Sequence, residues 1–149
     1  MIIDEAKIFI ASGKGGNGAV AFRREKYVSK GGPSGGNGGN GGNVIFLADR
    51  NLNTLLDFQY KRKYIAENGD PGGTSLKDGK TGKDIIIKVP VGTLIKDLET
   101  EEVLFDLDED GKKVIAAKGG KGGKGNSNFA TPTKQAPRYA EPGKPGVEK

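Results

Sequence analysis

Short apolar runs alternate along this chain with longer polar runs that are rich in glycine. The apolar runs contain many β-branched residues, which favours β-strands over helices. Asp110-Gly111 predicts a tight hairpin turn before the last apolar run. Many short strands at close spacing predict a mostly β fold, a small antiparallel barrel or sandwich. We expect strands over residues 6–11, 44–48, 84–89, 93–97, 103–107 and 114–117, and one helical turn within residues 51–58, capped by Asn51 or Asn53.

The glycine run from Gly31 to Asn43 has a regular period. Eight of its 13 residues are glycine, and Gly-Gly-Asn repeats three times from Gly35 onward. Three residues per turn is the period of the polyproline II helix, on which two bare rows would let neighbouring backbones approach closely. A flexible linker is the alternative. A similar run covers residues 119–126, with lysine in place of asparagine, and residues 68–83 form a further irregular glycine-rich stretch.

These glycine runs lie between predicted strands, whereas linkers join separate domains. Ordering glycine costs backbone entropy, so ordered runs need hydrogen bonds to one another. We therefore predict a packed bundle in which the side-chain amides of Asn37, Asn40 and Asn43 bond to neighbouring backbones. The whole chain, 1–149, is read as one domain, and residues 127–149 as an extended arm.

Composition narrows the possible chemistry. The chain has no cysteine and no histidine, which excludes disulfides, thiolate chemistry and the commonest general base. It has no long apolar run and no basic, apolar leader, so we expect no membrane span and a cytoplasmic location. The net charge of +5 is a mild excess that is compatible with a nucleic-acid partner.

Three stretches resemble known ligand-binding motifs only partly. Residues 13–18 match G-x-G-x-x-G, but no second strand with a terminal acidic residue follows. Residues 73–81 resemble a P-loop with a spacer one residue too long and no strand before it. Residues 106–111 match half of a calcium loop whose final ligand position holds Ala117. We expect no catalytic, nucleotide-binding or metal-binding residues in this chain.

Basic residues cluster on the glycine-rich and irregular stretches, with aromatic residues among them. Lysine and arginine attract phosphates, small residues let a loop approach an RNA backbone, and aromatic rings stack on unpaired bases. A solvated basic surface is the alternative explanation for any one cluster. The candidate RNA-binding residues are Arg23, Arg24, Lys26, Tyr27, Lys30, Lys77, Lys80, Lys83, Lys121, Lys124, Lys134 and Arg138.

Three long motifs together resemble a known family. They are Gly15-Gly16-Asn17-Gly18 with Phe22-Arg23-Arg24-Glu25-Lys26-Tyr27-Val28 and Gly31-Gly32-Pro33, then Lys88-Val89-Pro90-Val91-Gly92-Thr93, and then Gly119–Asn126 with Phe129-Ala130-Thr131-Pro132 and Ala136-Pro137. As a set, they resemble the N-terminal Obg domain of the Obg/CgtA GTPases over essentially the whole chain.

The resemblance implies a bundle of left-handed polyproline II helices on a small β-barrel. It also implies a parent protein that binds and hydrolyses GTP with Mg²⁺ in a following domain and acts in assembly of the large ribosomal subunit. This domain would enter the peptidyl-transferase region, and the family's RNA-contacting loops correspond to residues 23–34, 68–83 and 126–142. No GTPase motif occurs in these residues, so we expect the chain alone to need no cofactor and to be inactive on GTP.

Two functions from different classes remain open from the sequence. The first is a ribosomal RNA-binding module of a GTPase. The second is a protein-interaction module that regulates its own GTPase domain without touching RNA. A stand-alone enzyme is disfavoured because no catalytic set is present, and we expect a monomer.

Overall fold

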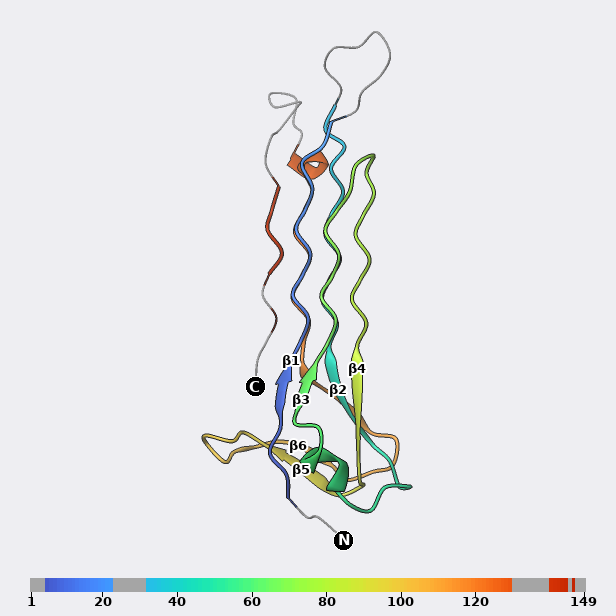
Figure 1. Ribbon diagram of the computed structural model, residues 1–149, viewed down its shortest axis with the longest axis vertical. Coiled ribbons are helices and arrows are strands. Elements are labelled where there is room, and N and C mark those ends of the chain that lie inside the picture. The colour runs from blue at the N-terminus through green and yellow to red at the C-terminus, as the bar shows by residue number, and fades with distance from the viewer. Residues whose placement is uncertain (1–4, 23–31, 130–139, 145, 147–149) are drawn as a thin grey trace.

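The chain folds into a cluster of short strands at one end and a long bundle of glycine-rich segments at the other (Figure 1). The computed structural model describes residues 5–22, 32–129, 140–144 and 146. Its elements are β1 (Phe9–Ala11), β2 (Val44–Ala48), η1 (Leu56–Gln59), β3 (Lys63–Ile65), β4 (Ile85–Val89), β5 (Thr93–Lys96), β6 (Val103–Leu107), β7 (Lys113–Ala117) and η2 (Asn126–Phe129), where η marks a 3₁₀ turn.

The predicted strands are confirmed, with β1 shorter than expected. The helical turn forms later than predicted, and Leu55 precedes it without a side-chain cap, so the proposed Asn51 or Asn53 cap is wrong. The sequence analysis missed β3 because its neighbours are basic. Only its central residue, Tyr64, is buried.

The strands form three small sheets and not a barrel. Among the described residues, the sheets are β1–β3, β4–β2–β7 and β5–β6, and none closes on itself. The predicted antiparallel barrel is therefore wrong. Two of the pairings, β1 with β3 and β2 with β4, are parallel, whereas β2–β7 and β5–β6 are antiparallel.

The bundle explains the parallel pairs. Strands β1, β3 and β7 lead the chain into glycine-rich segments, while β2 and β4 follow such segments (Figure 1). Two strands that both enter the bundle run in the same direction, and so do two that both leave it. Each excursion through the bundle thus serves as the long crossover that a parallel pair requires.

The turn predicted at Asp110-Gly111 forms, but it does not make a hairpin. Gly111 has a φ of 82°, and the Lys112 N–H donates to the Glu109 carbonyl at 3.1 Å. The two strands that it joins belong to different sheets, since β6 pairs with β5 and β7 with β2. A turn signal specifies a local reversal of the chain, and the partner of each strand is decided elsewhere.

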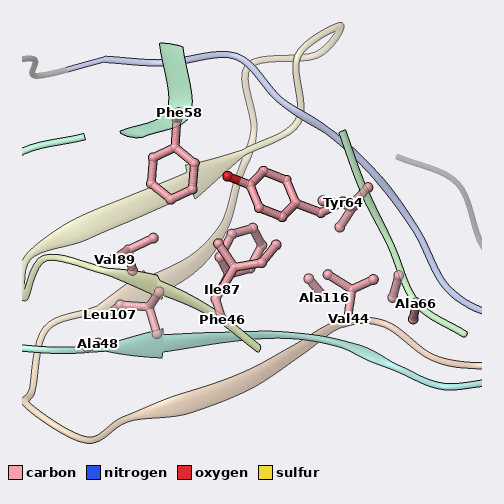
Figure 2. Packing of buried hydrophobic residues seen from close by; sticks show 12 residues of the cluster. Val44, Phe46, Ala48, Phe58, Tyr64, Ala66, Ile87, Val89, Leu107 and Ala116 are labelled. Atoms are coloured by element: carbon pink, nitrogen blue, oxygen red, sulfur yellow. The ribbon is translucent and has the colours of Figure 1, made fainter. Parts of the chain in front are cut away.

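The hydrophobic core lies inside the strand cluster (Figure 2). Val44, Leu107 and Val89 are among its most completely buried side chains. The Tyr64 ring meets Phe58 edge-on, with centroids 5.8 Å apart. Burial, helped by the charge of Asp57, raises the pKa of the Tyr64 hydroxyl above its usual value. This small core anchors the ends of the glycine segments.

The bundle contains six described segments joined side by side by hydrogen bonds. The N–H groups of Gly13, Gly16 and Ala19 donate to carbonyls of a neighbouring segment at 2.8 to 2.9 Å. The other contacts between segments recur in the same way at every third residue. We call the segments first (13–21), second (34–43), third (67–73), fourth (77–84), fifth (118–126) and sixth (140–144). The predicted packing of the glycine runs into a bundle is confirmed.

Close backbone contact explains the glycine content of the bundle. Gly39 donates its N–H to the Asp70 carbonyl, and a Cβ at Gly39 would collide with the Lys80 carbonyl. Equivalent collisions with backbone carbonyls occur at nearly every described glycine of the segments. Side chains fit only on the remaining row, where they point out of the bundle or bond across it.

The asparagine ladder is confirmed. The Oδ1 atoms of Asn37, Asn40 and Asn43 accept N–H groups of the fifth segment at 2.9, 2.9 and 2.7 Å, from Gly125, Gly122 and Gly119 respectively. The three amides thus satisfy backbone donors at three successive levels of the bundle.

Candidate nucleic-acid interface

The fourth segment presents a row of three lysines. Lys77, Lys80 and Lys83 are three residues apart, and all three are exposed. Their carbonyls accept N–H groups of the third segment at 2.7, 2.9 and 3.3 Å. The backbone under each lysine is therefore held in place, while the ammonium groups face solvent.

The fifth segment presents a second row. Lys121 and Lys124 belong to the predicted set, and exposed Lys118 extends their spacing by one repeat. The carbonyls of Lys121 and Lys124 accept N–H groups of the sixth segment at 2.9 Å each, and that of Lys118 accepts the Ser12 hydroxyl at 2.8 Å. The sequence analysis missed Lys118, although the Lys-Gly-Gly period contains it.

None of these six lysines is ion-paired within the part of the chain that the structure describes. The two ion pairs found there are Arg50–Asp110, at 3.8 Å, and Lys112–Asp108, at 3.2 Å, both near the strands. The charges of the two lysine rows are thus available to an anionic partner.

Most of the other candidate RNA-binding residues cannot be placed. Phe22 and Pro33 face each other in an isolated β-bridge at the end of the bundle remote from the strands (Figure 1). The candidates that lie outside the described residues are Arg23, Arg24, Lys26, Tyr27, Lys30, Lys134 and Arg138.

A buried asparagine organises that end of the bundle. Asn126 is fully buried, and its Oδ1 accepts the N–H groups of Gly35 at 2.8 Å and Ala21 at 3.4 Å. Its Nδ2 donates to the Ala21 carbonyl at 3.0 Å. One side chain therefore joins the first, second and fifth segments, which makes the end of the bundle a rigid support.

The partial motifs of the sequence have structural roles. The N–H groups of Gly13, Gly15, Gly16 and Gly18 all donate to neighbouring segments at 2.8 to 2.9 Å, so they are not free to cradle a phosphate. Residues 73–81 contain the reversal between the third and fourth segments.

Chemistry of other kinds finds little support in the described ranges. Their side chains contain no group of three or more acidic or histidine residues placed to hold a metal ion. No helix there is long and apolar enough to cross a membrane. The widest groove, about 830 Å³, lies among the strands beside residues 5–8 and β5.

Comparison with known proteins identifies the family. The family model described as GTP1/OBG matches residues 3–149. The chain belongs to this family. The resemblance found in the sequence motifs is thereby confirmed.

Similar curated proteins carry one name. GTPase Obg of Clostridium novyi (strain NT) is 62% identical over 149 residues, covering 100% of this chain and 35% of the relative. GTPase Obg of Caldicellulosiruptor bescii is 62% identical over 148 residues, covering 99% of this chain and 35% of the relative. GTPase Obg of Persephonella marina is 62% identical over 147 residues, covering 99% of this chain and 43% of the relative.

The chain therefore spans between 35% and 43% of the length of these relatives. In GTP1/OBG terms, the bundle, the lysine rows and the strand cluster all belong to the portion that this chain shares with them.

Proposed function

We propose that this domain binds RNA of the large ribosomal subunit, at its peptidyl-transferase region, and acts in assembly of that subunit. The observation that carries the proposal is the pair of lysine rows, exposed and without ion pairs in the described structure, on a rigid backbone. Family membership and the printed name of the relatives add the context of a GTPase.

The geometry suits a phosphate backbone. A protein cation that neutralises a phosphate releases a condensed counterion, and that release drives binding without reading sequence. Rows of cations at a constant spacing along a rigid support offer several such contacts at once. Because the bundle is already ordered, little entropy is lost when the lysines engage.

The remaining lines of the proposal concern the longer protein. Its relatives are named GTPases, so we propose that the full-length protein binds and hydrolyses GTP with Mg²⁺ outside these residues, in the cytoplasm. The domain itself is proposed to be monomeric and to contact its own GTPase domain.

We further propose that the glycine segments are left-handed polyproline II helices. Hydrogen bonds that recur at every third residue support this assignment, since three residues per turn is the polyproline II period. Vibrational circular dichroism should show the polyproline II signature in the isolated domain. A spectrum of strands and turns alone would contradict the assignment.

The RNA proposal is tested by changing Lys77, Lys80 and Lys83 together to glutamine. We expect binding to purified large ribosomal subunits to weaken about tenfold or more, because each lost phosphate contact lowers the slope of log affinity against log salt by about 0.7 to 0.9. Cosedimentation at several salt concentrations measures both quantities.

A matched control removes the same charge elsewhere. Lys63, Lys88 and Lys96 are exposed on strands β3, β4 and β5, and changing them to glutamine should leave the salt slope unchanged. Equal weakening in both triple variants would indicate a nonspecific effect of net charge and would contradict the proposal. Salt-independent binding, together with a changed GTPase rate of the full-length protein after truncation of this domain, would favour the regulatory alternative.

A further inference from the structure

A strained turn closes the hairpin between the third and fourth segments. Ser75 and Leu76 have φ angles of 56° and 59°, and the Lys77 N–H donates to the Thr74 carbonyl at 3.1 Å. Two consecutive positive φ angles at the centre of a hairpin turn are ordinarily met by asparagine, aspartate and glycine. A bulky leucine in the left-handed region is an outlier that costs conformational energy.

Packing does not account for this leucine. Its side chain is 50% exposed and lies outside the hydrophobic core. The turn is nevertheless held firmly, because the Leu76 N–H donates to the Ser34 carbonyl at 2.7 Å and the Gly73 N–H to the Lys77 carbonyl at 2.7 Å. Strained residues that the surrounding structure holds in place are concentrated at binding sites.

The position of the turn indicates a ligand. It lies at the end of the bundle remote from the strands (Figure 1), and the first lysine of the fourth-segment row follows it directly. Asp78, the next residue, accepts the Asn37 N–H through Oδ1 at 2.8 Å, so its carboxylate bonds to the second segment. An apolar side chain therefore projects beside a row of cations.

We propose that Leu76 packs against the face of an unpaired RNA base while the adjacent lysines hold the phosphates. This inference rests on the proposed function and adds a base-contacting residue to it. Nucleic-acid-binding proteins insert apolar side chains, leucine included, beside or between bases in this manner. Such a contact would make the domain distinguish unpaired loops from continuous duplex, which lysines alone do not do.

The test compares two RNA hairpins with the same stem and unpaired loop, one with its loop bases and one with an abasic loop. Leu76→Asn keeps a residue that tolerates the left-handed conformation but removes the apolar contact. We expect this variant to bind the hairpin with bases about tenfold more weakly than the wild type, the loss appropriate to a buried leucine. The abasic hairpin should bind wild type and variant within about twofold, with the salt slope unchanged.

Ser75→Gly serves as the control, since it relieves strain in the same turn and retains Leu76. It should bind both hairpins as the wild type does, and both variants should unfold at or above the wild-type temperature. Equal weakening of Leu76→Asn on both hairpins would overturn the inference, because the loss would then not involve a base.

The two levels of the proposal can fail separately. If Leu76→Asn binds as the wild type does while the fourth-segment lysine variant is weakened, the inference is overturned and the proposed function stands. If Leu76→Asn is weakened only on whole ribosomal subunits, the leucine contacts protein and the inference is also overturned. If the wild type binds neither hairpins nor subunits, both fall.

Discussion

Glycine positions in this domain differ in what their neighbours permit. Gly39 lies where a Cβ would meet the Lys80 carbonyl, whereas the nearest atom to a Cβ at Gly73 is the Lys77 Cβ, at 3.5 Å, an ordinary contact. Both residues donate their N–H groups to another segment. The first therefore needs glycine for steric reasons, and the second does not.

This difference predicts opposite effects of one substitution. Gly39→Ala should lower the free energy of unfolding by about 3 kcal/mol, because the added methyl must displace backbone that is hydrogen-bonded on both sides. Gly73→Ala should leave it unchanged or raise it by about 0.5 kcal/mol by restricting the unfolded chain. Urea unfolding of the two variants measures both values. Equal effects would contradict the steric explanation.

Each glycine segment depends on its neighbours for its hydrogen bonds. Gly36 and Gly38 of the second segment donate to Gly73 of the third and Gly123 of the fifth, at 2.9 and 2.8 Å. A single segment would leave these groups to water and would be disordered. The strands inherit their directions from this arrangement, which is why β2 pairs in parallel with β4.

The sequence predicted the strands and the lysine rows unequally. Alternation and β-branching located the strands except β3, where one buried residue, Tyr64, carries too weak a pattern. For the candidate site, Lys77, Lys80 and Lys121 could be named from composition alone. The special conformation of Leu76 could not, because no sequence rule places a leucine at positive φ.

The whole molecule is electrically polar. Residues 97–110, which include the turn between β5 and β6, contain eight carboxylates and no lysine or arginine. The lysine rows lie in the bundle, away from these strands (Figure 1). A polyanion such as RNA would therefore attract the bundle and repel the strand end, and so orient the domain as it approaches.

Neutralising the acidic turn should accordingly raise RNA affinity. Changing Glu99, Glu101 and Glu102 to glutamine should speed association with large ribosomal subunits about two- to fivefold at low salt, and much less at high salt, because screening removes long-range repulsion. Stopped-flow association rates at two salt concentrations test this. Slower association of the variant would show instead that the acidic turn contacts the partner.

The sequence alone determined the three-residue glycine period, most strands and the family, because each of these is written in local patterns or in long contiguous motifs. Only the tertiary structure decided which segments are neighbours, that β1 pairs in parallel with β3, and that Leu76 is strained and exposed. The physical reason is that the bundle is held by hydrogen bonds between residues far apart in the chain, such as Gly120 to Gly13 at 2.8 Å. Such contacts are a property of the whole assembly of segments, and no single stretch of sequence specifies them.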